Sequence, residues 1–356
     1  MPRRSLPPKK RLLRLAALVL AVAAGGFSLE GCFSAPRYAG PVTDHFDGKR
    51  FRNQVPIEDR GFGDVLRWRL SRKAEIWKGY RPEIVKSPVV ERVDGGDLRV
   101  TFIGHATVLI QIAGLNVLTD PIWAKRASPL SWAGPKRFAP PGLDLDELPP
   151  IDAVVVSHNH YDHLSVSTLR ELTRRGVPLV LAPLGNRSLL DRKGIAGARD
   201  LDWWETHRID DGVSITCVPA QHFSGRGLSD RMATLWGGFV IETPDGVVYY
   251  AGDTGVGPHF EQVRERFGPP RLAVLPIGAY RPAWFMQPVH VDPREAAEAH
   301  LTLGARTSLA VHYGCFELAD EGPMTPVTEL DDACRSLEIP RENFWTLAIG
   351  EARNAP

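Results

Sequence analysis

The sequence predicts an α/β fold in which two β-sheets are packed between helices. Short apolar segments rich in β-branched residues recur along most of the chain, and they alternate with segments of helical periodicity. Two strand-rich halves are each followed by helices, and no repeat of fixed period relates them. With 356 residues and 43% hydrophobic residues, the chain can form one large core or two modest ones.

The first half opens with β-strands. Residues 98–103 and 107–112 are apolar and β-branched, and residues 113–116 predict a turn into a strand at 117–119. A proline-rich loop then leads to residues 153–156, a continuous apolar run typical of a strand buried on both faces.

The next segments alternate between helix and strand. Leu169 and Leu172 have helical spacing before Gly176, a helix-ending residue, and residues 179–182 predict the following strand. In the second half, further strands are predicted at 214–218, 239–242, 247–250, 272–275 and 309–311.

Two local signals in the second half are specific. Residues 243–246 read Thr-Pro-Asp-Gly, which predicts a hairpin turn. Asp292 is followed by Pro293 and Glu295, the pattern of a capped helix start, and Gly304 predicts its end.

The N-terminal residues 1–31 are predicted to be a lipoprotein signal peptide. A cationic stretch ends at Arg14, and the uncharged run 15–29 is too short to span a bilayer comfortably. Leu29-Glu30-Gly31-Cys32 resembles a bacterial lipobox, although Glu30 is unusual there. Cys32 is therefore the predicted lipidation site, and an uncleaved N-terminal anchor is the alternative.

The predicted location is the cell envelope, outside the cytoplasm. Phe33 after the cysteine favours the outer membrane in a Gram-negative cell. Residues 32–97 are predicted to form a tether and an arm packed on the main domain, 98–356. Without residues 1–31 the chain has 37 basic and 41 acidic residues, so no basic surface for nucleic acid is expected.

The remaining cysteines, which are not spaced as a disulfide framework, are Cys217, Cys315 and Cys334. Buried thiols are expected, with one disulfide possible.

The segment His158-Asn159-His160-Tyr161-Asp162-His163 carries the strongest functional signal. It places three imidazoles and a carboxylate within six positions at the end of a predicted buried strand. Imidazole nitrogen and carboxylate oxygen are ligands that zinc accepts. Packing alone does not explain this pattern, which predicts a metal site.

Further ligands follow other predicted strands. His222, Asp253 and His312 each come after an apolar run, where functional groups in helix-covered sheets recur. A single histidine in such a place is more often structural. Three such residues together favour a site for two metal ions.

The motifs resemble those of the metallo-β-lactamase superfamily, and within it the N-acylphosphatidylethanolamine-hydrolysing phospholipases D. The resemblance covers about residues 41–350. It rests on the ligand segment and on the following motifs: Gly104-His105-Ala106-Thr107, Leu118-Thr119-Asp120-Pro121, Gly134-Pro135-Lys136-Arg137-Phe138, Gly252-Asp253-Thr254-Gly255, His290-Val291-Asp292-Pro293 and Val311-His312-Tyr313-Gly314. Ascorbate-phosphate lactonase-like hydrolases share some of these motifs. Cys315 replaces a threonine usual in relatives.

The resemblance implies an αββα sandwich of two mixed sheets flanked by helices, and two Zn²⁺ ions per chain. One zinc would be held by His158, His160 and His222, and the other by Asp162, His163 and His312. Asp253 would bridge the two ions.

Three further residues match family positions. Asp120 resembles a carboxylate that orients a ligand, and a turn-forming role before Pro121 is its alternative. His290 resembles an active-site histidine, or is a structural residue before the helix at Asp292. His105 is a possible pocket residue.

The implied activity is phospholipase D-type hydrolysis of N-acylphosphatidylethanolamine-like lipids. A hydroxide bridging the two zinc ions would attack phosphorus, with Asp162 or His290 assisting proton transfer. The lipidated N-terminus would hold the enzyme at a membrane surface, and the family suggests a homodimer. Five aromatic residues in predicted loops either line an acyl-chain groove or pack in the core: Trp123, Trp132, Phe138, Trp284 and Phe285.

Two alternatives remain at the level of sequence. The first is a lactonase or phosphoesterase that acts on a small soluble substrate, since the same ligand set serves carbonyl and phosphoryl chemistry. The second is a noncatalytic envelope binding protein, for which a lost ligand would be expected.

Overall fold

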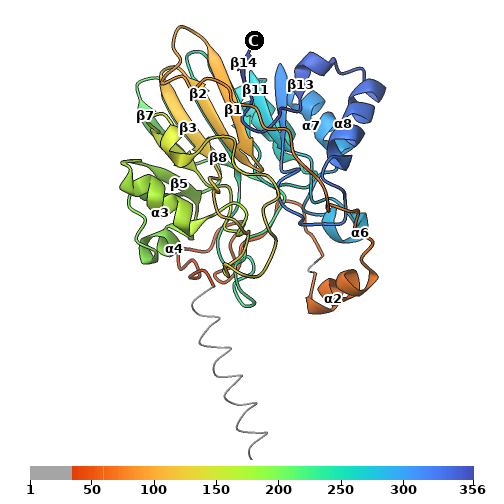
Figure 1. Ribbon diagram of the computed structural model, residues 1–356. Helices are drawn as coiled ribbons and strands as arrows, with labels where there is room; N and C mark the ends of the chain where they lie inside the picture. Colours follow the sequence, from red (N-terminus) through yellow and green to blue (C-terminus); the bar gives the residue numbers. More distant parts are fainter. Residues whose placement is uncertain (1–33, 59) are drawn as a thin grey trace, which may run out of the picture.

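The computed structural model describes residues 34–58 and 60–356. The predicted signal peptide and Cys32 lie outside the described residues. Two seven-stranded sheets pack face to face, and helices cover the outer face of each, so the predicted αββα sandwich is confirmed (Figure 1).

The first sheet has the strand order β14-β1-β2-β3-β4-β5-β6. Its strands are β1 (Leu98–Gly104), β2 (Thr107–Ile112), β3 (Leu115–Thr119), β4 (Ala153–Val155), β5 (Val180–Pro183), β6 (Ala198–Leu201) and β14 (Ala352–Ala355). The second sheet has the order β13-β12-β11-β10-β9-β8-β7. Its strands are β7 (Thr206–Asp210), β8 (Val213–Val218), β9 (Gly238–Thr243), β10 (Gly246–Tyr250), β11 (Leu272–Pro276), β12 (Thr307–Val311) and β13 (Phe344–Trp345).

The two sheets share one pairing pattern. From β14 to β3 the neighbours are antiparallel, and from β3 to β6 they are parallel. From β7 to β10 they are antiparallel, and from β10 to β13 parallel. The two strand-rich halves seen in the sequence therefore form similar sheets, although the first needs β14 from the far end of the chain.

The helices of the described chain are α2 (Phe62–Ser71), α3 (Val166–Arg174), α4 (Asn186–Arg192), α5 (His259–Phe267), α6 (Ala283–Met286), α7 (Pro293–Leu303) and α8 (Thr325–Ser336). Helices α3 and α4 lie on the first sheet, whereas α7 and α8 lie on the second (Figure 1). The predicted cap of α7 is present, because Asp292 accepts a hydrogen bond from the Glu295 amide and Gly304 ends the helix in the left-handed conformation.

The main core lies between the sheets. Its large buried side chains include Phe102, Trp236, Phe239, Tyr249 and Tyr250. A second apolar cluster fills the space between the first sheet and α3, where Leu169 and Leu172 are buried. The continuous apolar strands predicted from the sequence are thus buried on both faces.

One predicted turn is shorter than expected. The turn between β2 and β3 is confined to Ala113 and Gly114, and Asn116 belongs to β3. Asn116 is tolerated in a strand because its buried amide donates to the carbonyls of Glu91 and Pro150.

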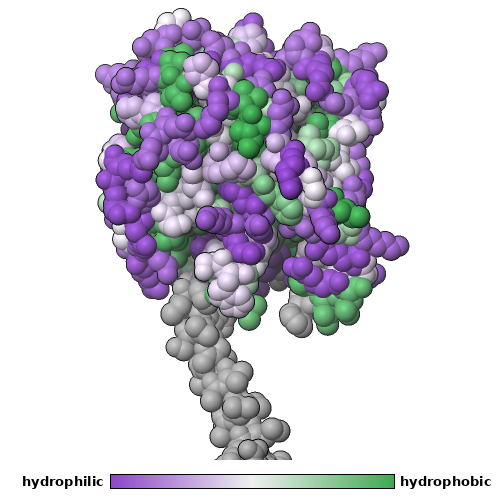
Figure 2. Space-filling view, viewed as in Figure 1, coloured by the Kyte–Doolittle hydropathy of each residue, from purple (hydrophilic) through white to green (hydrophobic). Residues whose placement is uncertain are grey.

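The segment before β1 packs on both sheets. Phe46 and Phe51 pair in a short bridge and are buried in the main core. Helix α2 protrudes from the lower end of the molecule in Figure 1 and carries a hydrophobic patch in Figure 2. Leu66 and Leu70 are exposed there, Leu70 to 80%. Among the described residues, no helix has the length and apolar character needed to cross a bilayer.

The three cysteines of the described chain, Cys217, Cys315 and Cys334, are buried free thiols. The expectation of buried thiols is confirmed, and no pair of these three forms a disulfide.

Candidate metal centre

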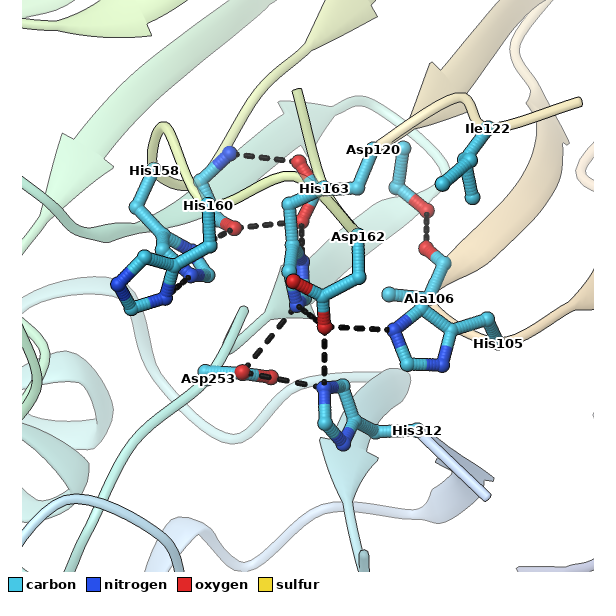
Figure 3. A network of polar contacts seen from close by, with 12 residues as sticks. His105, Ala106, Asp120, Ile122, His158, His160, Asp162, His163, Asp253 and His312 are labelled. Carbon is cyan, nitrogen blue, oxygen red and sulfur yellow. Dashed lines mark hydrogen bonds and ion pairs between the residues drawn. The ribbon is translucent and has the colours of Figure 1, made fainter. Parts of the chain in front are cut away.

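The polar residues that follow the strands converge at one end of the sandwich (Figure 3). The loop after β4 supplies His158, His160, Asp162 and His163, and the segments after β10 and β12 supply Asp253 and His312. His222 arrives from the segment after β8. The structure brings all seven predicted ligands together, in two groups joined by Asp253.

The first group consists of His158, His160 and His222. The Nδ1 atom of His160 lies 2.8 Å from His158 Nε2 and 3.3 Å from His222 Nε2. At these distances the three ring nitrogens cannot all carry protons directed at one another, so most of them present lone pairs to the space between them. This arrangement suits a shared cation, for which neutral imidazole is a preferred ligand.

The outer nitrogens of this group are fixed by hydrogen bonds. His158 Nδ1 donates to Ser157 Oγ at 2.9 Å, and His222 Nδ1 donates to the Val289 carbonyl at 2.9 Å. Each bond leaves the Nε2 lone pair directed into the centre. Burial lowers the pKa of His158 and His222 well below the usual value, so both rings are neutral.

The second group consists of His105, Asp162, His163 and His312. The Oδ2 atom of Asp162 lies 3.0 Å from His105 Nε2, 3.3 Å from His163 Nε2 and 3.4 Å from His312 Nε2. His105 therefore contacts the carboxylate of Asp162 directly. Burial lowers the pKa of His105 to about 3.

Asp253 lies between the two groups. Its Oδ2 atom is 3.1 Å from both His163 Nε2 and His312 Nε2, and 3.9 Å from His222 Nε2. Burial opposes ionisation of Asp253, but the neighbouring His163 and His312 hold the pKa of its carboxyl well below the usual range. A charged carboxylate in this position is suited to bridging two cations.

Several buried atoms of the centre have no hydrogen-bond partner in the described chain. They are His105 Nδ1, His163 Nε2, Asp253 Oδ1, His290 Nδ1, and both ring nitrogens of His312. Unsatisfied buried polar atoms are costly in a folded protein. These atoms are grouped around two carboxylates. The residues present therefore fit a centre that binds divalent cations.

The carboxylates also favour protonation of a ligand, so a proton competes with metal for that ligand. Burial lowers the pKa of His312, but Asp253 and Asp162 outweigh that effect and raise it to about 9. A bound cation would replace this proton, because a ligating imidazole must be neutral.

Asp120 lies behind His163 and is fully buried. Its Oδ2 atom accepts hydrogen bonds from His163 Nδ1 at 2.6 Å, Ser157 Oγ at 2.5 Å and Tyr250 OH at 2.5 Å. Its Oδ1 atom accepts from the Ser157 amide at 2.7 Å. Asp120 thus orients His163 and does not itself face the centre between the two ligand groups.

The solvent-facing side of the centre is formed by His160, Asp162 and His290, which are partly exposed. The side chains of Asp162 and His290 are 13% and 11% exposed, whereas those of His163 and His312 are at most 1% exposed. His290 Nδ1 lies 3.9 Å from Asp253 Oδ2, and His290 packs edge-on against His222. His290 is therefore part of the site.

Backbone geometry reflects the demands of the site. Asp120, His105 and His312 all have positive φ angles, of 31°, 60° and 66°. Such strain costs free energy and is concentrated at functional sites. Gly278 is required nearby, because a Cβ atom there would lie 2.0 Å from the His312 carbonyl oxygen.

Three supporting residues were not identified from the sequence. Ser157 and Tyr250 hold Asp120, and Asn53 holds His222 by a reciprocal pair of bonds: its Nδ2 donates to the His222 carbonyl, and its Oδ1 accepts from the His222 amide. Ser157 and Tyr250 adjoin predicted strand ends, which is a usable signal. Asn53 belongs to the N-terminal arm, where no sequence signal pointed to a role in the site.

The five aromatic groove candidates do not form one surface. Trp123 packs with the cluster under α3 and donates to the Leu143 carbonyl, and Phe138 packs against Trp77 with its ring tilted. Trp132 is 75% exposed. Trp284 and Phe285 lie together in α6, and Phe285 stacks on Trp68 of α2.

The fold and the convergent histidines and carboxylates define a metal-dependent hydrolase. Residues 115–313 match the family model described as the beta-lactamase superfamily domain. An uncharacterized protein of Mycobacterium tuberculosis is 36% identical over 340 residues, covering 90% of each chain. The N-acyl-phosphatidylethanolamine-hydrolyzing phospholipase D 1 of Caenorhabditis elegans is 39% identical over 268 residues, covering 71% of this chain and 75% of that one.

Solved structures share the fold at lower identity. The isothiocyanate hydrolase from Delia radicum gut bacteria has a TM-score of 0.56 and 22% identity, covering 72% of this chain and 98% of that one. The chain belongs to the metallo-β-lactamase superfamily and is similar to the N-acylphosphatidylethanolamine-hydrolysing phospholipases D within it. The family resemblance read from the motifs is confirmed.

Proposed function

We propose that this metallohydrolase cleaves the phosphodiester bond of N-acylphosphatidylethanolamine-like lipids with two zinc ions. The observation that carries the proposal is the 39% identity with a phospholipase of that specificity over 268 residues. The ligand loop and the three later ligands fall within the chain matched by the superfamily model, 115–313.

Zinc is favoured by the donor set of imidazole nitrogens and two carboxylates. His158, His160 and His222 would hold one ion, and Asp162, His163 and His312 the other, with Asp253 shared. When bound, two such cations polarise a phosphoryl group and make water more acidic.

The protein's own residues supply positioning and proton transfer. Asp162 and His290 are, with His160, the partly exposed members of the centre, so a substrate that enters from that side meets them first. Burial lowers the pKa of His290 to about 4, so its ring is neutral at ordinary pH and offers one N–H donor and one acceptor nitrogen to a substrate. His105 fixes the Asp162 carboxylate through the 3.0 Å contact.

A paired substrate assay tests the proposal. Zinc-loaded protein is incubated with an N-acylphosphatidylethanolamine and, in parallel, with a panel of lactones. We expect release of phosphatidic acid and an N-acylethanolamine, and loss of this activity together with most bound metal in Asp253→Asn. Asp211→Asn, the same change at an exposed turn residue, is the matched control.

The outcomes separate the alternatives. Turnover of lactones alone would remove the phospholipase proposal. Turnover of neither substrate class by protein with two bound zinc ions would favour a noncatalytic binding protein. Retention of two zinc ions and near-normal turnover by Asp253→Asn would refute the bridging role.

We further propose that the enzyme is exported and anchored to a membrane through lipidated Cys32, outside the described residues. An enzyme that acts at a lipid surface is compatible with the exposed apolar side chains of Leu66 and Leu70 on α2 and Trp284 on α6. Cys32→Ser should release the protein from membranes without changing turnover of a detergent-dispersed lipid. Unchanged membrane association would remove lipidation from the proposal, and sedimentation of the purified protein tests the homodimer.

The second candidate function is hydrolysis of a small soluble ester or lactone. A cleft of about 340 Å³ lies beside the centre, where Gln221 precedes His222 and Pro288 precedes Val289. Its lining is mixed, with Glu58 and Glu295 as well as apolar side chains. A cleft of this size and mixed lining suits a small substrate.

A further inference from the structure

A cationic cavity lies on the opposite side of the metal-binding loop. Its volume is about 380 Å³, within the range of small-molecule sites. Tyr161 and Leu164 of the loop line it, together with the start of α3. The residues of interest are four basic and two hydroxyl side chains: Arg126, Arg170, Lys193, Arg226, Ser165 and Ser167.

The three arginines of this cavity have no carboxylate partner within ion-pair distance in the described part of the chain. None of the described residues that line the cavity is an Asp or a Glu. Within residues 34–58 and 60–356, no ion pair within 4.0 Å is formed by Arg126, Arg170 or Arg226. Each donates instead to backbone: Arg126 to the Gly134 carbonyl and Arg170 to the Lys193 carbonyl.

Arg226 connects the cavity to the metal-binding loop. Its Nη1 atom donates to the carbonyls of Asn159 at 2.7 Å and Leu164 at 3.0 Å, which bracket the last three ligands of the loop. The guanidinium also lies 3.8 Å from the centroid of the Tyr161 ring. Burial lowers the pKa of Arg226, which shows that its charge is poorly solvated. An anion beside it would offset that cost.

The start of α3 adds to the same cavity. This helix has nine residues, and Ser165 caps it by accepting from the Thr168 amide. The N-terminus of a helix favours anions, and Ser167 in the first turn is exposed at the cavity. Guanidinium groups, hydroxyl groups and a helix N-terminus together form the usual set of phosphate-binding elements.

We propose that this cavity binds a phosphate group, and that it is a second ligand site distinct from the metal centre. None of the seven predicted metal ligands lines it. Its ligand is a phosphate monoester, supplied either by a soluble metabolite or by the headgroup of an anionic lipid. The proposal does not depend on the substrate of the metal centre.

Calorimetric titration with inorganic phosphate tests the site in full-length, zinc-loaded protein. The wild type is compared with Arg126→Gln/Arg170→Gln, which removes two cavity charges and keeps hydrogen-bonding side chains. Arg174→Gln is the matched control, because Arg174 lies on α3 outside the cavity and pairs with Glu171. Phosphate that binds at the zinc ions contributes equally to all three titrations.

We expect one phosphate-binding event to disappear from the titration of the double variant, or its affinity to fall at least about tenfold. Arg174→Gln should retain that event with wild-type affinity. Ser167→Glu is a second variant that places a carboxylate in the cavity at a helix start that tolerates it, and it should abolish the same event. Titrations of the double variant and of Ser167→Glu that match the wild type would overturn the proposal.

Two further arms identify the source of the phosphate. One uses sn-glycerol 3-phosphate in solution, and the other uses phosphatidylcholine vesicles with and without phosphatidic acid. Competition by glycerol phosphate alone supports a soluble ligand. Vesicle binding that requires phosphatidic acid and falls in the double variant supports a lipid headgroup.

Discussion

Replacement of Asp120 by Asn tests how the second ligand group is held. In the wild type, the Oδ1 atom of Asp120 accepts from the Ser157 amide, and its Oδ2 atom accepts from Ser157 Oγ, Tyr250 OH and His163 Nδ1. The backbone amide cannot reverse its role, but the two hydroxyls can rotate. The new side-chain amide NH₂ should therefore occupy the Oδ2 position.

That orientation changes the tautomer of His163. Its Nδ1 atom would accept a hydrogen bond from the new amide, so the ring proton would move to Nε2, the atom 3.1 Å from Asp253. A protonated Nε2 cannot bind metal. Loss of such an orienting partner typically costs about 10- to 100-fold in metal affinity, or roughly 1.4–2.7 kcal/mol.

The assay is competition for zinc with a chromophoric chelator, together with the metal content of the purified protein. Tyr250→Phe is the matched control, because it removes one donor to Asp120 and leaves the bond to His163 intact. We expect weaker binding of one zinc in Asp120→Asn and near-wild-type binding in Tyr250→Phe. Two tightly bound zinc ions in Asp120→Asn would refute the tautomer argument.

Three more outcomes are expected. Asn53→Ala should weaken zinc binding by the first group, measured by the same competition, because His222 loses both bonds from the arm. Chelation should lower the melting temperature reversibly, since ligand at about 100 times its Kd contributes roughly 2.7 kcal/mol; an unchanged melting temperature would contradict a bound metal. Burial lowers the pKa of His45, but its hydrogen bonds to Asp202 and Asp44 raise it overall. The stability from this contact, about 1 kcal/mol or less, should be complete below pH 6.5 and lost as the pH rises through the folded-state pKa. The measurement is the denaturant midpoint of the wild type and of His45→Gln from about pH 5 to 9. A difference between the two midpoints that does not change with pH would contradict this prediction.

The sequence predicts helices and strands correctly where their local signals agree with their burial in the fold. The strands β2, β9 and β10 and the capped helix α7 follow from apolar runs, a Thr-Pro-Asp-Gly turn and the Asp292 cap. The ligand positions could be predicted because His222, Asp253 and His312 each follow an apolar strand and because the motifs resemble those of the superfamily. Their meeting with the histidine-rich loop depends on how the second sheet packs on the first, which no local signal predicts.

Elements without such signals could not be predicted. Strand β7 has an alternating exposed pattern, and β14 is mostly exposed, so neither has the apolar run of a buried strand. They exist because an edge strand is already present to pair with them. The contact of Asn53 with His222 joins residues 169 positions apart and depends entirely on how the arm packs.

Strand β14 has a consequence for assembly of the protein. Its residues pair with β1 in the register Leu98 with Ala355, so the first sheet cannot be complete until nearly the whole of the described chain has been synthesised. Until then, β1 presents an unpaired edge that can template association with other chains. Chaperones that keep a chain extended would shield this edge, and truncations before Ala352 should be prone to aggregation.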